Sequence, residues 1–386
     1  MIENNLIQRF EDELFTLEQH GNTRKLPHIT QQGNSIQQHG KEYYNLSSND
    51  YLGLAADQEL RQEFLNSLTK DNAVFSASSS RLLTGNHALY AQLETTLCHM
   101  FGTESALVFN SGYHMNMGIL PAICDARTLI LADKCVHASL IDGIRLARGA
   151  SYRYRHADYN HLTELLAAHA HLFTRVIIVT ESIFSMGGDC TDLRYLASLK
   201  RRYPNTLLYV DEAHAVGVRG IKGFGCAEEQ QCIADIDFLT GTFGKALASV
   251  GGYLLCRKPI RNYLINKART LLFTTALPPI NLLWSIFILE RLSDFADRRQ
   301  QLHNHSTLLK QQIIAKGLHC PSQSHILPVI IGNNLETIQK AEELQQKGFY
   351  VLPIRPPTVA EGTSRIRISL TATLTTSIVN QLAASL

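Results

Sequence analysis

Short, nearly continuous hydrophobic runs alternate with longer amphipathic segments over much of the chain. Several runs consist almost entirely of Val, Ile and Leu, which is typical of strands buried on both faces. Segments between them, such as Asp192–Tyr203, are long enough to form crossover helices. The alternation predicts an α/β fold with a mostly parallel sheet that is covered by helices on both sides. The runs are Ala106–Phe109, Leu129–Ala132, Tyr152–Arg155, Val176–Val179, Leu207–Val210, Ile236–Leu239 and Gly252–Cys256.

The pattern changes at both ends of the chain. Near the start, hydrophobic residues from Leu6 to Leu17 recur at helical spacing and predict an amphipathic helix. After about residue 275, a long helical segment near Asn281–Arg299 precedes smaller hydrophobic runs at Ile326–Ile331, Tyr350–Pro353 and Arg365–Leu370. We therefore expect an N-terminal helical segment (residues 1–45), a large α/β domain (46–278) and a small C-terminal α+β domain (279–386).

The composition excludes some classes of protein but does not identify the function. The formal net charge is +2 and no basic tract is present, so neither nucleic acid nor a membrane surface is an expected partner. The most apolar window, Leu282–Leu289, is too short to span a bilayer. The first residues lack the pattern of a secretory signal. The eight cysteines are irregularly spaced with no C-x-x-C pair, so we expect reduced thiols in a cytoplasmic protein, with no metal site.

The strongest chemical signal follows the run that ends at Leu239. Thr240-Gly241-Thr242-Phe243-Gly244-Lys245 places one lysine in small, uncharged surroundings after a predicted strand. Burial without a partner lowers the pKa of a lysine and favours a nucleophilic amine for carbonyl chemistry. A surface lysine on a tight turn is an equally good interpretation of this segment alone.

A carboxylate and an imidazole follow the run Leu207–Val210. Asp211 comes directly after the predicted strand, and His214 lies three residues later. An aspartate at this position can pair with a protonated pyridine nitrogen and so favour an electron-sink cofactor. A magnesium ligand or a helix N-cap would look the same, although the chain has no G-x-x-x-x-G-K-[ST] phosphate loop.

Residues that follow other predicted strands could also contact a ligand, but each is weaker evidence for a site. Ser185 lies in a Gly-bounded loop where it could bind a ligand oxygen or simply form a turn. Gly112 and Tyr113 stand at a predicted helix start, where backbone N–H groups bind phosphate. His137 could stack on a planar ring, although a lone histidine is more often structural. Because ligands bind beyond the carboxyl ends of parallel strands, these residues together predict one cofactor site.

These segments, in this order, resemble the α-oxoamine synthases, a branch of the fold-type I pyridoxal-phosphate (PLP) enzymes. The resemblance covers nearly the whole chain, and it includes Leu46–Gly53, Ser80–Asn86, Asp211–His214, Thr242–Lys245 and Ile354–Arg367. It implies a seven-stranded, mostly parallel sheet, a smaller C-terminal domain and PLP as cofactor. The Arg-Pro-Pro-Thr-Val stretch at residues 355–359 is similar to that of family members that condense L-alanine with a pimeloyl thioester of CoA or acyl carrier protein in biotin biosynthesis.

The resemblance assigns roles position by position. It makes Lys245 the Schiff-base lysine and catalytic acid–base group, Asp211 the partner of the pyridine nitrogen, and His137 the residue that stacks on the ring. It places His214 and Ser185 near the phenolate oxygen. The remaining implied contacts are Gly112, Tyr113 and Thr242 near the phosphate, Thr274 and Thr275 reaching the phosphate of a neighbouring subunit in a homodimer, and Arg24, Asn49, Thr358 and Arg367 on the substrates.

Two departures and three rival functions accompany this hypothesis. The family has a glycine-rich run where this chain has Phe75–Ser79, and it commonly has glycine where this chain has Ala248. The rivals are another acyl-thioester condensing enzyme (2-amino-3-ketobutyrate CoA ligase or a quorum-signal synthase), a non-catalytic partner subunit, and a nucleotide-binding oxidoreductase. Gly217–Gly225 lacks the G-x-G-x-x-G spacing that the last requires, and retention of Lys245 argues against a non-catalytic chain.

Overall fold

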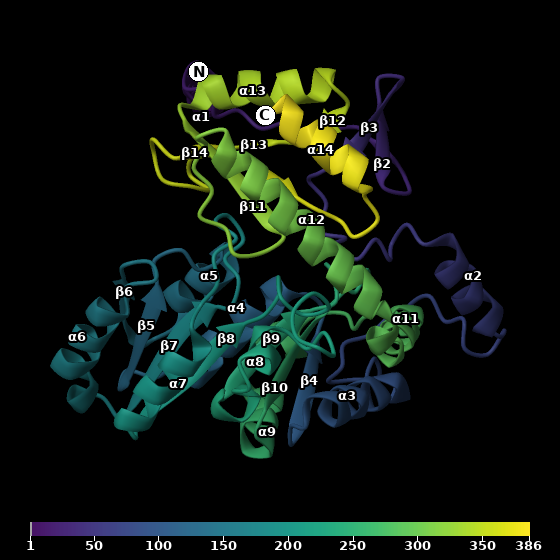
Figure 1. The fold of residues 1–386 in the computed structure, drawn as a ribbon. Helices are drawn as coiled ribbons and strands as arrows, with labels where there is room; N and C mark the ends of the chain where they lie inside the picture. The colour runs from purple at the N-terminus through teal and green to yellow at the C-terminus, as the bar shows by residue number, and fades with distance from the viewer. Residues whose placement is uncertain (1) are drawn as a thin grey trace. The chain divides into compact units, whose positions relative to one another are not determined.

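The structure, a computed structural model, describes residues 2–386 and divides into two compact units (Figure 1). The large unit comprises Asn49–Ser185 and Asp189–Gln301. Of the described residues, the small unit comprises 2–48, Met186–Gly188 and Leu302–Leu386. In this division the N-terminal segment groups with C-terminal residues, and residues 279–301 group with the large unit. The expected domain ranges stay a prediction.

The large unit is built on the predicted seven-stranded sheet. Its strand order is β4-β10-β9-β8-β7-β5-β6. All neighbours are parallel except β10, which runs antiparallel to both β4 and β9. Each of the seven hydrophobic runs overlaps a strand of this sheet, so the predicted sheet is confirmed. The strands are β4 (Ser105–Phe109), β5 (Thr128–Asp133), β6 (Ala150–Tyr154), β7 (Arg175–Glu181), β8 (Thr206–Asp211), β9 (Phe238–Thr242) and β10 (Gly252–Cys256).

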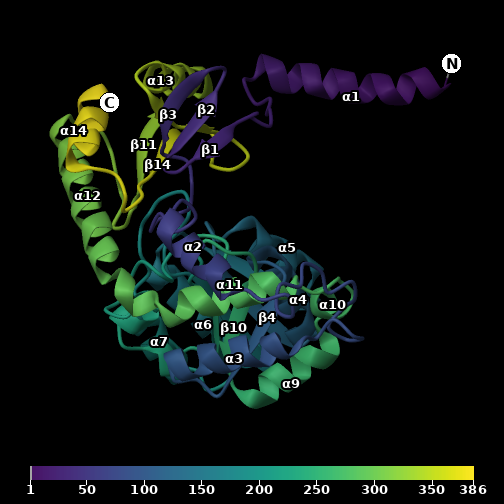
Figure 2. The same ribbon diagram turned by 90° about the vertical axis from the view of Figure 1, so that its right-hand side faces the viewer.

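Helices lie on both sides of this sheet (Figures 1 and 2). Several begin at a side chain that accepts a backbone N–H, as Ser111 does for α4 and Asp192 does for α7. The segment Asp192–Tyr203 forms α7 as predicted. The helices of the large unit are α2 (Gln58–Ser67), α3 (Ala88–Phe101), α4 (Gly112–Ile123), α5 (Ala138–Leu146), α6 (Tyr159–His169), α7 (Leu193–Arg202), α8 (Cys226–Glu229), α9 (Lys258–Lys267), α10 (Arg269–Leu272) and α11 (Pro279–Glu290), with 3-10 turns at Ala170–Leu172, Ile233–Asp235 and Leu292–Phe295.

A continuous hydrophobic core joins one face of the sheet to its helices. Ile119 of α4 and Leu264 of α9 are fully buried in the same cluster as Ile177 of β7 and Leu254 of β10. Burial of such side chains stabilises the fold by about 1.5–3 kcal/mol each. The core fixes the strand ends in space and therefore fixes the residues that follow them.

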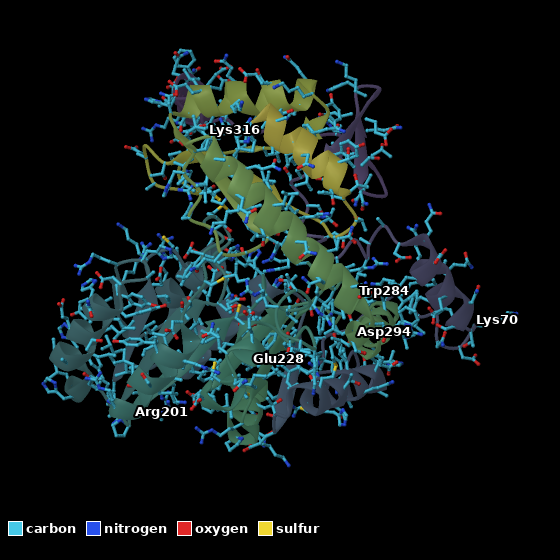
Figure 3. The ribbon with its side chains drawn as sticks, viewed as in Figure 1. Lys70, Arg201, Glu228, Trp284, Asp294 and Lys316 are labelled. Carbon is cyan, nitrogen blue, oxygen red and sulfur yellow. The ribbon has the colours of Figure 1, made fainter. Side chains whose placement is uncertain are left out.

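The long helix expected near Asn281–Arg299 is interrupted, and this prediction is wrong. Helix α11 ends at Glu290, a 3-10 turn covers Leu292–Phe295, and α12 (Ala296–Ala315) continues from the large unit into the small one. Helix α11 stays with the large unit because its mostly apolar surface packs there. Trp284, labelled in Figure 3, donates its Nε1–H to the carbonyl oxygen of Ala248 at 2.8 Å.

The small unit contains two sheets and four helices among the described residues. Strands β11, β14 and β13 form an antiparallel sheet in that order, while β12 instead pairs in parallel with β3. The hydrophobic residues from Leu6 to Leu17 lie on an N-terminal helix as predicted, but their side chains are exposed. The elements are α1 (Ile2–Gln19), β1 (Thr30–Gln32), β2 (Ser35–Gln38), β3 (Lys41–Asn45), α12, β11 (Ile326–Gly332), α13 (Asn334–Gln346), β12 (Phe349–Tyr350), β13 (Pro353–Ile354), β14 (Ser364–Ser369) and α14 (Thr376–Ser385).

Two further features relate to the expectations about membrane spanning and about the cysteine thiols. Within residues 2–386, no helix combines the length and apolar character that crossing a membrane requires. All eight cysteines carry free thiols, and five of them are buried.

Candidate active site

The carboxyl ends of neighbouring parallel strands bring the predicted residues to one edge of the large sheet. Glu181 at the end of β7 pairs in register with Asp211 at the end of β8. Lys245 follows β9 after a short turn, and His137 lies between β5 and α5. The prediction that these strand ends form one site is consistent with this topology.

The turn that carries Lys245 is held by the Thr242 hydroxyl and by backbone hydrogen bonds. Thr242 Oγ1 donates to the carbonyl oxygen of Gly251 at 2.8 Å and accepts the N–H of Gly244 at 3.1 Å. The N–H of Ala248 closes the turn onto the carbonyl oxygen of Lys245 at 2.9 Å. Ala248 has a φ of 48°, in the region that glycine adopts without strain. The turn therefore fixes the start of the lysine side chain.

A hydrogen-bonded series leads away from the lysine amine. Lys245 Nζ lies 2.7 Å from His214 Nε2, and His214 Nδ1 lies 2.7 Å from the hydroxyl oxygen of Tyr51. Tyr51 donates its hydroxyl proton to Asn49 Oδ1 at 2.9 Å. The Tyr51 oxygen therefore accepts from His214 Nδ1–H, which leaves the lone pair of Nε2 facing the lysine amine. This tautomer is assigned from the hydrogen-bond partners.

Asp211 is buried, with 6% of its surface exposed. Its Oδ1 accepts the N–H of Ala213 at 2.9 Å, and its Oδ2 accepts from Asn116 Nδ2 at 2.8 Å. The residues that follow it form turns, so the helix N-cap alternative does not hold. The carboxylate is thus oriented by two donors from different segments.

The surroundings of His137 and Glu181 shift their pKa values so that both side chains are neutral. Burial lowers the pKa of His137, and the Lys245 ammonium lowers it further, which outweighs the opposite effect of Asp211. The imidazole is therefore neutral, as a ring that stacks on a cofactor would be. Burial and the neighbouring Asp211 charge raise the pKa of Glu181 well above its usual range. Glu181 is consequently a neutral acid beside Asp211.

Gly112 and Tyr113 form the N-terminus of α4, where the first backbone N–H groups of a helix favour phosphate. The Tyr113 ring lies 6.3 Å from the ring of His137 in an edge-on arrangement. Thr275 lies near this helix, because Asn110 Nδ2 donates to its carbonyl oxygen and it forms an isolated bridge with Ser80. Thr275 itself is exposed and Thr274 is half-buried. Ser185 is buried in the loop after β7.

The predicted substrate residues of the small unit also include a direct contact. Arg24 Nη2 donates to Thr358 Oγ1 at 3.2 Å across 334 positions of sequence. Arg355 holds the same segments together by donating to the carbonyl oxygens of Gly21 and Thr23. Burial and the neighbouring Arg24 charge lower the pKa of Arg355. Arg367 lies on β14 with 9% of its surface exposed.

Sequence reasoning missed three residues of this site. Tyr51 lies within the quoted segment Leu46–Gly53 but was not singled out, although it is fully buried against His214. Asn116 follows Gly112 by four residues, which places both on one face of α4. Glu181 ends a hydrophobic strand as Asp211 does, and this signal was available in the sequence.

The residues present fit PLP. The donor set contains an amine for its aldehyde, a buried carboxylate for its ring nitrogen, a neutral planar imidazole for its ring face and a helix N-terminus for its phosphate. In addition, the buried Oε1 of Glu181 has no hydrogen-bond partner among residues 2–386. The large unit supplies all these groups.

Comparison with known proteins agrees with this geometry. The family model "Aminotransferase class I and II" matches residues 41–386. A Neisseria meningitidis protein (serogroup A, strain Z2491) with the name "Putative 8-amino-7-oxononanoate synthase" is 52% identical over 377 residues, which cover 98% of this chain and 99% of that protein.

Solved structures of related enzymes share the fold. The serine palmitoyltransferase of Sphingomonas wittichii is 28% identical with a TM-score of 0.88, covering 99% of this chain and 95% of that one. A structure of SPT with PLP is 25% identical with a TM-score of 0.87, covering 99% and 97%. The 8-amino-7-oxononanoate synthase of Francisella tularensis is 27% identical with a TM-score of 0.76, covering 89% and 95%. The chain therefore belongs to the aminotransferase class I and II family, and within that family it is an enzyme of the α-oxoamine synthase type.

Proposed function

We propose that the protein is a PLP-dependent acyltransferase that condenses L-alanine with a pimeloyl thioester to form 8-amino-7-oxononanoate, a step of biotin biosynthesis. The reaction releases CO₂ from the alanine carboxylate and the thiol of CoA or acyl carrier protein from the thioester. The observation that carries the proposal is the contact of Lys245 with His214 beside the buried Asp211, in a chain 52% identical to a relative of that name.

The residues of this chain have separate tasks in the proposed reaction. When bound, PLP supplies an electron sink for the bonds at the amino acid's Cα. The Lys245 amine removes the Cα proton of alanine and later returns one to the product. The lone pair of His214 Nε2 orients that amine by accepting one of its protons. Asp211 would pair with the ring nitrogen and favour its protonated form.

Three of the four proposed substrate contacts belong to the small unit, and Asn49 belongs to the large unit. The Arg367 guanidinium would bind the alanine carboxylate through two parallel hydrogen bonds. Arg24 and Thr358, which contact each other, would bind the acyl substrate. Asn49 would bind substrate near Lys245, to which Tyr51 and His214 connect it.

We also propose that the active form is a homodimer in which Thr274 and Thr275 reach the phosphate held by the partner. Exposed hydrophobic side chains on two adjoining segments support this proposal. On the first segment, Phe75 and Leu83 are more than two-thirds exposed, and on the second segment Phe273 is 66% exposed. An isolated β-bridge between Ser80 and Thr275 joins the two segments. Sedimentation of the protein as a monomer at micromolar concentration would contradict the dimer.

The decisive experiment supplies PLP, L-alanine and either pimeloyl-CoA or pimeloyl-acyl carrier protein, and identifies the product by mass spectrometry. We expect 8-amino-7-oxononanoate from the wild type and none above background from Lys245→Ala. Lys258→Ala, which removes an exposed lysine at the start of α9, is the matched control and should retain activity. A wild type that accepts other amino acid and thioester pairs but not these would refute the proposed substrates.

A second α-oxoamine synthase activity remains as a candidate because the fold does not separate the branches. The serine palmitoyltransferase and the 8-amino-7-oxononanoate synthase are about equally identical to this chain. Testing glycine or serine with acetyl-CoA and longer acyl-CoA thioesters in the same assay discriminates between the branches.

A further inference from the structure

Asn116 is a buried amide at the centre of the site, with 1% of its surface exposed. Its Nδ2 donates to Asp211 Oδ2 at 2.8 Å and to Ser139 Oγ at 2.9 Å. Its Oδ1 accepts the Tyr209 hydroxyl proton at 2.6 Å. An ionised carboxylate can only accept, so the amide nitrogen must face Asp211, and the orientation of the whole amide follows.

The same amide controls a second residue through Ser139. Because Ser139 Oγ accepts from Asn116, its own hydroxyl proton can be donated to His137 Nδ1 at 2.8 Å. The Ser139 backbone N–H also points to that nitrogen at 3.2 Å. His137 Nδ1 is therefore an acceptor, and the proton of the neutral ring is on Nε2.

These contacts join three elements that are distant in sequence. Asn116 belongs to α4, Ser139 to the first turn of α5, and Tyr209 and Asp211 to β8. Helix α4 also carries Gly112, so one helix presents both the proposed phosphate-binding end and the amide that orients the ring-binding carboxylate.

We propose that Asn116 is a positioning residue for the cofactor, because it orients the Asp211 carboxylate and, through Ser139, sets the tautomer of His137. The inference rests on the proposed use of PLP at this site. It adds to that proposal a residue that would not touch the cofactor but would determine how two of its partners are held.

The variant Asn116→Asp tests the inference through cofactor affinity alone. The new carboxyl has nearly the same shape as the amide, and when protonated it can still donate one hydrogen bond to Asp211. When it ionises, it repels Asp211 and donates nothing. Of the titratable groups, Asp211 and Tyr209 contact the Asn116 amide directly. Asp211 in turn interacts electrostatically with His137 and Glu181, and Lys245 and Asp142 also act on His137.

The dissociation constant of PLP is measured by absorbance titration of cofactor-free protein at about pH 6 and about pH 9. Relative to wild type, we expect Asn116→Asp to bind PLP about tenfold more weakly at the higher pH and nearly normally at the lower pH. Equal affinities of variant and wild type at both pH values would overturn the inference. Asn205→Asp is the control, because Asn205 donates to the carbonyl oxygens of Ala170 and Phe173 and should show no added pH dependence.

Ser139→Ala keeps the inference testable if Asn116→Asp does not fold. This variant removes the hydroxyl between Asn116 and His137 but keeps the contact with Asp211. We expect an approximately threefold loss of PLP affinity with no added pH dependence. An unchanged affinity would remove the His137 part of the inference, and cofactor-free melting temperatures verify that both variants are folded.

These titrations contain no alanine and no thioester. A protein that binds PLP but does not form 8-amino-7-oxononanoate would therefore refute the proposed reaction, while the role of Asn116 would be decided by the titrations alone.

Discussion

Lys245 Nζ lies 2.7 Å from His214 Nε2, although the two residues are 31 positions apart and follow different strands. The contact gives the amine an acceptor, because the other nitrogen of His214 faces the Tyr51 hydroxyl at 2.7 Å. Tyr51→Phe should therefore free the His214 ring to change tautomer. The sequence identified Lys245, but only the folded chain shows its contact with His214 and the contact of His214 with Tyr51.

Asp211→Asn should lower kcat by about a hundredfold or more, since a neutral amide cannot hold a proton on the ring nitrogen and general acid–base effects of this kind are worth about 10²–10⁴. The measurement is steady-state product formation with saturating L-alanine and thioester. Melting temperature should also fall, because the amide oxygen can still accept the N–H of Ala213 but the new NH₂ group then faces Asn116 Nδ2, which is itself a donor.

The matched control for that variant is Asp237→Asn. Asp237 is an equally buried carboxylate immediately before β9, and it pairs with Lys200 at 2.6 Å and Arg257 at 3.2 Å. It should lose stability and keep kcat near that of wild type. If Asp237→Asn and Asp211→Asn lowered kcat equally, Asp211 would have no special catalytic role.

Ala248→Gly should stabilise the protein by up to about 1.5 kcal/mol. Ala248 has a φ of 48°, a conformation that costs an L-residue about 1–2 kcal/mol, while glycine loses about 0.5–1 kcal/mol through greater chain entropy. The free energy of unfolding from urea titration measures the difference. Ala246→Gly, in the same turn but without a positive φ, is the control and should be destabilising.

The two departures from the family's sequence have a common structural basis. Ser78 and Ala248 both have a φ of 48°, and both lie at positions where the resemblance implies glycine or a glycine-rich run. The sequence showed the departures but could not show that a left-handed backbone is required there, because that depends on the final turn geometry.

The hydrophobic pattern predicted the sheet of the large unit well for a physical reason. Strands buried on both faces, such as β7 and β8, must be apolar along their length, and this requirement is visible in the sequence. Glu181 and Asp211 then mark the strand ends. The break after α11 was not predictable, because Asn281–Arg299 has helical character on both sides of Arg291 and only packing selects where the helix turns.

The sequence alone could not predict the long-range contacts between polar residues. Nothing in the local sequence of Asn116 indicates that its amide would meet Asp211. The resemblance named Arg24 and Thr358 separately as substrate residues, and only the structure shows that Arg24 Nη2 lies 3.2 Å from Thr358 Oγ1. Hydrogen bonds of this kind depend on the complete chain path.

Arg367→Lys should raise the KM for L-alanine about tenfold or more, because a lysine cannot form the two parallel hydrogen bonds that a guanidinium offers to a carboxylate. The KM for the thioester should change much less. Arg365→Lys is the control on the same strand: Arg365 donates to the carbonyl oxygens of Thr363 and Met186, so its loss should affect stability rather than the KM for alanine. Equal KM values for both variants would contradict the assignment.

His156 should make the stability of the protein depend on pH. Its Nδ1 lies 2.8 Å from Asp133 Oδ1 and its Nε2 lies 2.9 Å from Asp189 Oδ2. Burial opposes the charged form, but the bonds to the two carboxylates outweigh it and raise the pKa of His156 to about 12. The unfolded value is about 6.5. The stabilisation is thus fully present below about pH 6.5 and is lost as pH rises toward 12.

The variant His156→Asn tests this argument by thermal unfolding between about pH 6 and pH 9. The melting temperature of wild type should exceed that of the variant most at the lower pH, and the difference should shrink as pH rises. Burial also raises the pKa of Glu212 to about 8 and of Asp50 to about 6, but these groups are common to both proteins, so their contributions cancel in the difference. A difference that is constant with pH would show that His156 is not charged in the folded protein.

The two carboxylate contacts of His156 also indicate whether this residue is a charged histidine or a metal ligand. Asp133, Cys135 and His156 have donor atoms within 4.8 Å of one another, the only such group found among residues 2–386. However, both nitrogens of His156 already face carboxylates, so a cation could bind only by displacing a proton and breaking one of these bonds. We therefore expect a chelator to leave the melting temperature unchanged at about pH 7, and a marked decrease would instead indicate a bound metal at this cluster.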